Sequence, residues 1–519
     1  MNREKSTPVI DLRQTVRRAS WSRLLIIVAA TLLILIASLL SHLRFDWTED
    51  RIYTLSESTL SVLNQLEEPV LIRAYVTSGL PQPYGRLNRF LEDILLSYHD
   101  AGAGNVGFEV VNPADDLNVA ASLAAMKIPK VQVQTIEDDQ AQVKQGYLAV
   151  VIEYLDSREI IPVIQSEEGF EYALTRKIRK LAGTEKVKVA IASGFGASEI
   201  NRLHKLKELL DDEYELITLR LGEEPVPVDV KTVIISGLEQ TPSEKYRYHI
   251  DQFRMRGGAL LLLAGSVKPQ LSEGFQVKPL ASGSLEWMKE DLGIAIEPGL
   301  IMDRQATRVT VNQHQNGFMI KSLVDYPFLP SVTLLENNHP VTDGLEGLSV
   351  PFASPLTWVG RGNVTISELM RSSEQSALQS GPPFDVNPLI PTETRFADIE
   401  QGSSVLALAI EGEHVSVFDQ AKGDKFRMIV VGAPSFFDNE FMSGSNLVAT
   451  LNMIDWLSGD EQLITLRSRG VTQRPIAELS STGRAFFKGI WVFGLPILVA
   501  LIGLWRWWAL NRRRSLSEA

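Results

Sequence analysis

Residues 187–198 read VKVAIASGFGAS, and this stretch indicates the fold of the larger part of the chain. An apolar run comes first, the glycines of SGFG follow, and the spacing of the next apolar residues predicts a helix over about 198–210. Apolar strands that alternate with helices are typical of a parallel, doubly wound sheet with both faces covered. We therefore predict a Rossmann-like α/β domain over residues 169–460.

The sequence that follows repeats this alternation. Further apolar strands are expected at 215–219, 232–236, 259–263 and 427–431, and helices at 169–181, 243–256 and 445–457. Residues 300–400 differ, because they are rich in Pro, Gly, Ser and Asn. They predict an irregular insertion or a smaller β-rich subdomain within the larger domain.

Residues 46–168 predict a separate, smaller α/β domain. Strands are expected at 70–77, 106–111, 131–135 and 148–154, with helices at 84–99 and 118–126. The order β-α-β-α-β-β, with Pro129 just before the third strand, is that of a thioredoxin-like domain. Because the chain has no cysteine, this would be a scaffold use of the fold without its redox site. A generic small α/β domain is the alternative.

Two glycine-rich stretches are candidates for a nucleotide or anion site. Residues 102–107 read GAGNVG, but they lie between a helix and the following strand, the reverse of the order in a dinucleotide-binding turn, so they predict an ordinary turn. The stretch after residue 192 has the order that such a site needs: a strand, then glycines, then a helix. Ligands of open α/β sheets bind at the carboxyl ends of strands, and helix N-termini favour anions. A tight turn built from glycines is the alternative. The candidate ligand-binding residues are Ser193, Gly194, Phe195, Gly196 and Ser198.

Two apolar segments predict transmembrane helices. Residues 24–43 contain no Asp, Glu, Lys or Arg and would reach, at about 1.5 Å per residue, across about 30 Å of hydrocarbon. The second segment, 489–510, carries tryptophans typical of the membrane interface. A cleaved signal peptide is the rival for the first segment, but the apolar run is too long and no small-x-small site follows it.

Arginines lie before the first apolar segment and after the second. The positive-inside rule therefore places the basic head (1–23) and the basic tail (511–519) in the cytoplasm. Residues 45–488, including a linker at 461–488, are then expected on the periplasmic side of the inner (cytoplasmic) membrane.

Composition and motifs exclude several classes of function. The formal net charge is −12, with 63 acidic against 51 basic side chains, which argues against a nucleic-acid partner. Without cysteine there are no disulfides, no thiol catalysis and no thiolate metal sites. No Walker A, G-x-S-x-G or H-E-x-x-H motif occurs, and the histidines are scattered. We therefore predict no catalytic residues, no metal site and no cofactor, and a chain that cannot power transport by itself.

Several segments together carry a family resemblance through their order and spacing. They are DWTEDRIYTLS (46–56), EPV (68–70), LTRKIRKL (174–181), VKVA with SGFG (187–196), MRGG (255–258), NHPVTDGL (338–345) and NMIDWLSGDE (452–461). With these segments the chain resembles, over about residues 24–510, the GldG family, an auxiliary component of ABC transport systems first associated with gliding motility.

The resemblance implies a fold, a function and partners. The family's central region is similar to the domain shared with the intraflagellar-transport protein of 52 kDa, itself related to class I glutamine amidotransferase-like sheets. The glutaminase cysteine is absent here, so amidotransfer is excluded. The implied function is that of a membrane-anchored, non-catalytic, extracytoplasmic accessory subunit of an ABC-2-type transporter.

The implied partners are a separate permease and a separate ATP-binding subunit, with membrane lipid contacted through the two helices. Two other functions stay open. One is a solute- or polymer-binding module of that transporter, and the other is an envelope-remodelling hydrolase.

Overall fold

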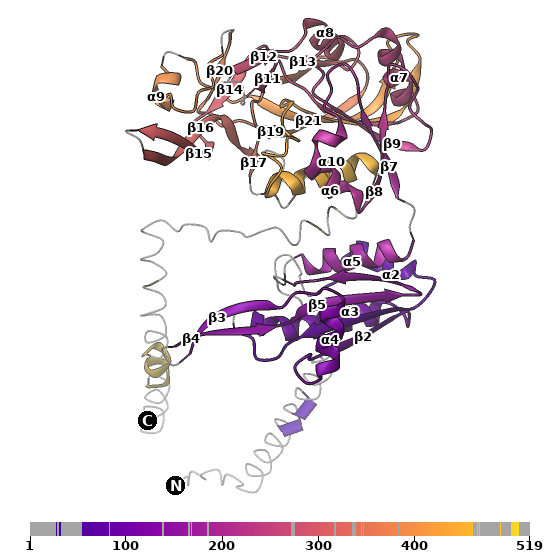
Figure 1. Ribbon diagram of the computed structural model, residues 1–519, viewed down its shortest axis with the longest axis vertical. Helices are drawn as coiled ribbons and strands as arrows, with labels where there is room; N and C mark the ends of the chain where they lie inside the picture. The colour runs from indigo at the N-terminus through magenta and orange to yellow at the C-terminus, as the bar shows by residue number, and fades with distance from the viewer. Residues whose placement is uncertain are drawn as a thin grey trace, which may run out of the picture. The chain divides into compact units, whose positions relative to one another are not determined.

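The structure is a computed structural model that describes residues 54–459 apart from short gaps (Figure 1). The gaps are residues 82–83, 138–139, 165–166, 168, 184–185, 271–275, 316–317, 335–338, 344, 346, 382–383 and 398. Outside that range it describes residues 27, 28, 31, 32, 464, 467, 488 and 500–507. Residues 1–471 and 472–519 form two separate compact units.

The prediction of two transmembrane helices needs correction. Within the described part of the chain, no helix has both the length and the apolar character needed to cross a bilayer. Most of the two predicted segments, 24–43 and 489–510, lies outside the described residues. The fold class that the structure supports is a mixed α/β fold with many strands, without the two flanking helices.

The first sheet has four strands in the order β2-β1-β5-β6. Strand β1 runs parallel to β2 and antiparallel to β5, and β5 runs antiparallel to β6. The strands are β1 (Val70–Val76), β2 (Val106–Val111), β5 (Leu148–Tyr154) and β6 (Ser157–Ile161). The helices that cover it are α2 (Glu57–Asn64), α3 (Leu87–Ala101), α4 (Leu117–Ala125) and α5 (Phe170–Leu181), and a 3-10 turn, η1 (Tyr84–Arg86), precedes α3.

Alternating side chains of this sheet form two cores. Ile72, Val150 and Ile152 pack with α2, α3 and α5 on one face, whereas Tyr75 and Val151 pack with α4 on the other. Helix α5, which the sequence placed at the start of the larger domain, therefore belongs to the core of this sheet.

The predicted third strand of the small domain lies outside its sheet. Strand β3 (Val131–Glu137) pairs with β4 (Gln140–Gly146) as a separate two-stranded hairpin. The segment does form a strand, as its alternation of apolar and polar residues predicts, but its partner is β4. The strand next to β1 is β5. Along the chain four strands follow α4, of which only β5 and β6 join the first sheet, so the predicted order β-α-β-α-β-β does not hold and the thioredoxin-like assignment is unsupported.

The second sheet has a parallel half and an antiparallel half. Its order is β15-β16-β19-β21-β22-β10-β9-β7-β8, with β17 (Leu348–Ser349) paired to β16. The parallel strands are β8 (Tyr214–Leu219), β7 (Val187–Ala192), β9 (Val230–Ser236), β10 (Ala259–Leu263) and β22 (Lys422–Val431). The antiparallel strands are β21 (Val405–Val415), β19 (Val364–Arg371), β16 (Phe318–Leu334) and β15 (Ala306–Gln315).

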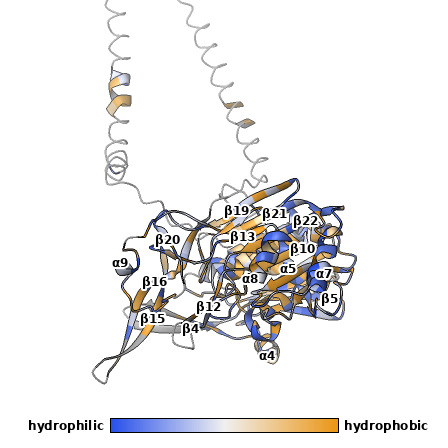
Figure 2. Ribbon diagram, turned by 90° about the horizontal axis from the view of Figure 1, so that it is seen from above, coloured by the Kyte–Doolittle hydropathy of each residue, from blue (hydrophilic) through white to orange (hydrophobic). Residues whose placement is uncertain are grey.

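Both faces of the parallel half are covered by helices, as the apolar strands predict. Leu261 and Leu263 pack with α6 (His204–Asp211) and α10 (Ser445–Ser458), while Leu260 and Leu262 pack with α7 (Glu244–Met255) and α8 (Ser282–Glu290). Figure 2 shows the resulting contrast between the hydrophobic strands around β10 and the more hydrophilic helix α7.

Residues 300–400, for which we predicted an irregular insertion or a small β-rich subdomain, consist largely of strands. Three of them, β15, β16 and β19, extend the second sheet. The short remaining elements between β10 and β21 are β11 (Val267–Gln270), β12 (Gln276–Pro279), β13 (Ile294–Ile296), β14 (Leu300–Asp303), β18 (Leu356–Trp358), β20 (Ser376–Gln379) and α9 (Thr392–Arg395). Phe328 and Phe352 form a core of their own here, with stacked rings 6.4 Å apart.

Candidate functional site

The predicted ligand-binding turn follows β7 at the carboxyl edge of the parallel strands, as expected. Gly194, Phe195 and Gly196 all have positive φ angles, of 98°, 52° and 81°. The chain does not enter a helix directly after them, since a 3-10 turn, η2 (Ile200–Arg202), precedes α6. The turn therefore lacks the helix N-terminus that the sequence predicted next to it.

Several polar groups of the turn already have partners inside the protein. The amide of Ser193 donates to the Leu219 carbonyl oxygen at 2.9 Å, and its hydroxyl lies 3.3 Å from the same oxygen. The amide of Ser198 donates to the Ser236 carbonyl oxygen at 2.8 Å. These bonds join the ends of neighbouring strands, so they leave fewer donors for an anion.

The rest of the turn packs against its neighbours. The Phe195 ring contacts Tyr246 edge to face at 5.3 Å. A Cβ atom added to Gly196 would lie 2.6 Å from the Cβ of Glu239, so the backbones approach too closely for another residue. Phe195 and Gly196 are thus closely packed, whereas Gly194 is exposed with open space beside it. Ligand binding by Ser193, Gly194, Phe195, Gly196 and Ser198 stays a prediction.

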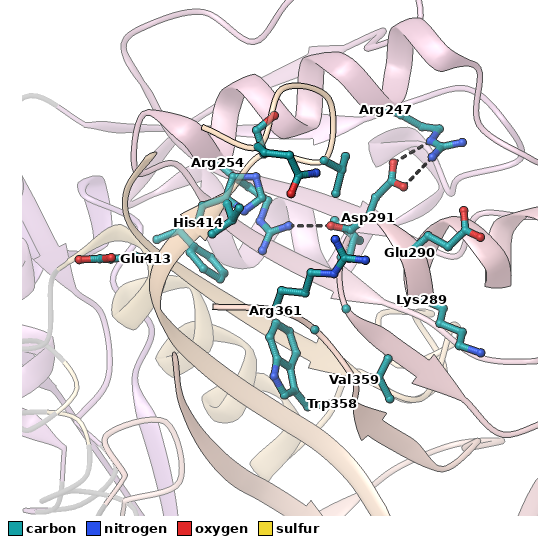
Figure 3. A pocket seen from close by; sticks show the side chains of 18 residues that line it. Arg247, Arg254, Lys289, Glu290, Asp291, Trp358, Val359, Arg361, Glu413 and His414 are labelled. Atoms are coloured by element: carbon teal, nitrogen blue, oxygen red, sulfur yellow. Dashed lines mark hydrogen bonds and ion pairs between the residues drawn. The ribbon is translucent and has the colours of Figure 1, made fainter. Parts of the chain in front are cut away.

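A pocket that the sequence did not reveal lies at the opposite edge of the same sheet (Figure 3). Its volume is about 490 Å³. The walls come from α7, the end of α8, the segment after β18, and the turn between β21 and β22. The charged residues that line it are Arg247, Arg254, Lys289, Glu290, Asp291, Arg361 and Glu413.

Arg254 is the buried cation of this pocket. It is 2% exposed, and its guanidinium lies over the Phe426 ring at 4.3 Å from the ring centre. Nη1 donates to the Asp291 carbonyl oxygen at 3.2 Å, but the buried Nε has no hydrogen-bond partner. Burial lowers the pKa of Arg254 to about 10, so it keeps its charge at neutral pH.

A buried polar cluster lies beside Arg254. His414 Nε2 and Ser416 Oγ each lie 2.9 Å from a different oxygen of the Asp251 carboxylate, and the Val417 amide donates to it at 3.2 Å. Burial alone would raise the pKa of Asp251, but these hydrogen bonds outweigh it and hold the pKa below its ordinary value. Burial, aided by nearby Arg254, lowers the pKa of His414.

The cluster has the residue types of a Ser-His-Asp triad without its geometry. In a triad the histidine accepts the proton of the serine hydroxyl. Here both His414 and Ser416 are bonded to Asp251, so the histidine does not activate the serine. The arrangement fixes the start of the β21–β22 turn against α7.

A second buried ionic cluster connects α5 with α10. Arg467 donates to Asp455 Oδ2 at 2.7 Å, to Asn452 Oδ1 at 2.6 Å and to the Tyr172 hydroxyl at 2.9 Å. The hydroxyl of Tyr214 donates to the other oxygen of Asp455. Burial raises the pKa of Asp455 to about 6.

The turn after α6 completes this connection. Arg176 of α5 forms ion pairs of 2.9 Å with both Asp212 and Glu213, and Tyr172 donates to Glu213 at 2.9 Å. The basic residues of α5 and the run at 211–213 therefore act as partners, although each alone has the composition of a solvated surface. Two of the segments that carry the family resemblance, 174–181 and 452–461, contribute residues to the contact.

Sequence spacing contained a signal for the missed pocket. Arg254 lies at i+4 and i+3 from Ile250 and Asp251, on the face of α7 that also buries Tyr246. That position predicts a buried cation. Within the described residues, no group of His, Asp or Glu side chains has the arrangement of a metal site.

Two family models match the chain. The model described as "ABC-type uncharacterized transport system" matches residues 186–458, which is more than half of the chain and spans the second sheet from β7 to α10. The chain therefore belongs to this family of auxiliary components of ABC transport systems. A model described as "Domain of unknown function (DUF7088)" matches residues 49–153, in the region of the first sheet.

Individual proteins similar to the chain include one curated relative. It comes from Borreliella burgdorferi, is described as an uncharacterized protein, and is 23% identical over 488 residues, covering 91% of this chain and 94% of its own. Among solved structures, the mmIFT52 N-terminal domain is similar with a TM-score of 0.32 and 11% identity, over 52% of this chain and 97% of that one. The exo-β-1,4-mannosidase Op5Man5 from Opitutaceae bacterium strain TAV5 is similar with a TM-score of 0.24 and 12% identity, over 80% of this chain and 55% of that one.

Proposed function

We propose that this auxiliary component of an ABC transport system is a non-catalytic, GldG-like accessory subunit that works with a separate permease and a separate ATP-binding subunit of the ABC-2 type. The observation that carries the proposal is the family match over residues 186–458. The segments of the GldG resemblance support the finer assignment. The sequence contains no Walker A motif, so the energy for transport comes from the ATP-binding partner.

The contact between α5 and the second sheet suggests how such a subunit acts. The Arg467–Asp455 ion pair is buried and bonded to Asn452 and Tyr172, and losing one partner of such a pair leaves a buried charge. The Arg467 and Arg176 contacts would hold the two sheets as one body. A rigid body beside the permease can restrain or transmit its movements, and the extracytoplasmic face of the membrane is the proposed location.

The experiment is purification of the chain from cells that also make the candidate permease and ATPase. The tag is placed at the C-terminus, a mild detergent is used, and mass spectrometry identifies what is recovered. Recovery of both partners in a fixed ratio supports the proposal. A solitary chain from such cells would count against it.

A further inference from the structure

We propose that the pocket between α7, the end of α8 and the β21–β22 turn binds a small anionic molecule that carries a carboxylate or phosphate group. The inference goes beyond the accessory role and does not depend on it. Its basis is the set of cations that lines the pocket: Arg254 is incompletely hydrogen-bonded, and Arg361 and Lys289 form no ion pair among the described residues (Figure 3).

The first observation is the incomplete pairing of Arg254. A guanidinium has five N–H donors, and leaving a buried donor without an acceptor costs about 1–3 kcal/mol. Arg254 is buried, has Nε without a partner, and has no carboxylate of the described residues within ion-pair distance. Asp251 and Asp291 lie near enough to act on its charge without forming an ion pair with it, so the guanidinium in the pocket wall can still attract an anion.

The second observation concerns the two cations at the rim. Arg361 and Lys289 line the pocket and, in the described part of the chain, form no ion pair. Figure 3 shows the Arg361 side chain directed into the space between Arg254 and Asp291. A planar guanidinium in this position suits the two oxygens of a carboxylate or phosphate.

The acidic residues of the pocket do not cancel these charges. The Asp291 carboxylate already forms a bidentate ion pair with Arg247, with distances of 2.6 and 2.7 Å. Glu413 points away from the cations in Figure 3 and lies 4.0 Å from Lys422. Glu290 lies at the exposed rim with Lys289 and Arg361, so the four cations that line the pocket outnumber its three carboxylates by one.

The size and the apolar wall of the pocket define the ligand class. A volume of about 490 Å³ is in the range of small-molecule sites. Trp358 and Phe426 line it beside the cations, and Gly360 leaves no room for a side chain against the Trp358 ring. A ring-sized molecule with one anionic group, such as an acidic or phosphorylated sugar, matches this combination.

The experiment is titration calorimetry on the full chain purified in mild detergent. The probes are inorganic phosphate, galacturonate and glucose 6-phosphate, with neutral galactose as the uncharged comparison. We expect at least one anionic probe to bind and galactose not to bind. Comparing galacturonate with the two phosphates identifies whether a carboxylate or a phosphate is preferred.

The key variant is Arg361→Gln, at an exposed residue whose replacement should leave folding intact. We expect its affinity for the bound probe to fall at least tenfold. The matched control, Arg220→Gln, removes an arginine that is 71% exposed outside the pocket and should change affinity less than twofold. Arg254→Lys, checked first for an unchanged melting temperature, should also weaken binding.

The proposal is overturned if none of the three anionic probes binds. It is equally overturned if Arg361→Gln binds the probe as tightly as the unaltered chain, or if galactose binds as well as galacturonate. Arg361→Gln alone decides this point should Arg254→Lys fail to fold.

Discussion

Arg467 illustrates how a single residue can hold distant parts of the chain together. Its guanidinium contacts the Asp455 carboxylate, the Asn452 amide and the Tyr172 hydroxyl, and it is only 4% exposed. A buried ion pair adds little to stability compared with a well-packed apolar pair, but the removal of one partner leaves an uncompensated charge. The cost of substitution should therefore be large.

We predict that Arg467→Ala lowers the free energy of unfolding by about 3–5 kcal/mol, because Asp455 loses its cation in a buried place. The control is Arg308→Ala, which breaks the exposed Arg308–Asp325 pair of 2.9 Å and should cost less than about 1 kcal/mol. Urea unfolding measures both. Equal losses in the free energy of unfolding for the two variants would show that Arg467 does not neutralise a buried charge on Asp455.

The pH dependence of stability tests the cluster around His414. Burial lowers the pKa of His414 below its ordinary value of 6.5, with Arg254 acting in the same direction and Asp251 opposing it. Between pH 7.5 and 5.0 this histidine takes up a proton in the unfolded chain, whereas in the folded chain its lowered pKa shifts protonation to lower pH. The contribution of His414 to stability is therefore present above pH 6.5 and is lost as the pH falls toward the folded pKa.

We predict that His414→Gln loses less stability than the unaltered chain over this pH interval, because glutamine donates to Asp251 without titrating. Urea unfolding at pH 7.5 and 5.0 checks the difference between the two slopes. Asp251 does not disturb the comparison, since its lowered pKa places its titration below the interval. Parallel pH curves would mean that His414 has the same pKa in the folded and the unfolded chain.

At the scale of elements, the glycine turn after β7 is a connection under tight steric limits. We predict that Gly196→Ala costs roughly 1–3 kcal/mol, because φ is 81° and the new Cβ would lie 2.6 Å from that of Glu239. Gly194→Ala is the matched control, with positive φ but no atom within 4 Å of the added Cβ, and should cost about 1–2 kcal/mol. Thermal unfolding of both variants tests whether Gly196→Ala is the less stable of the two. A lower melting temperature for Gly194→Ala would contradict the prediction.

The parallel half of the second sheet could be predicted from the sequence because its strands are buried on both faces. The apolar runs at 187–192 and 259–263 coincide with β7 and β10, and the helix at 243–256 coincides closely with α7. The strand at 131–135 was placed in the wrong sheet. Alternation specifies that a segment is a strand, but its partner depends on contacts with residues far along the chain.

The sites were less accessible to sequence reasoning than the strands. The glycines of residues 193–198 were located correctly at the carboxyl edge, yet their packing depends on Glu239 and Tyr246 from later elements. The pocket around Arg254 gathers residues from four separate segments, none of which forms a motif. Ion pairing is similarly invisible in the sequence, because Arg176 and Glu213 meet only when α5 packs beside the second sheet.

At the scale of the whole molecule, the two sheets belong to one accessory component of a transport system. The family match covers the second sheet, and the contacts of Arg467 and Arg176 connect it to α5 of the first. An accessory subunit is expected to change the activity of the proteins that it binds. An effect on ATP hydrolysis is therefore the consequence that separates an accessory subunit from a chain that merely accompanies the transporter.

The most direct test is the ATP hydrolysis rate of the purified permease–ATPase complex, measured in the same detergent with and without this chain. We predict that adding the chain stimulates or restrains hydrolysis, and that the change saturates at the ratio found in the purified assembly. A hydrolysis rate that stays the same at every ratio, in a complex shown to contain the chain, would contradict the accessory role.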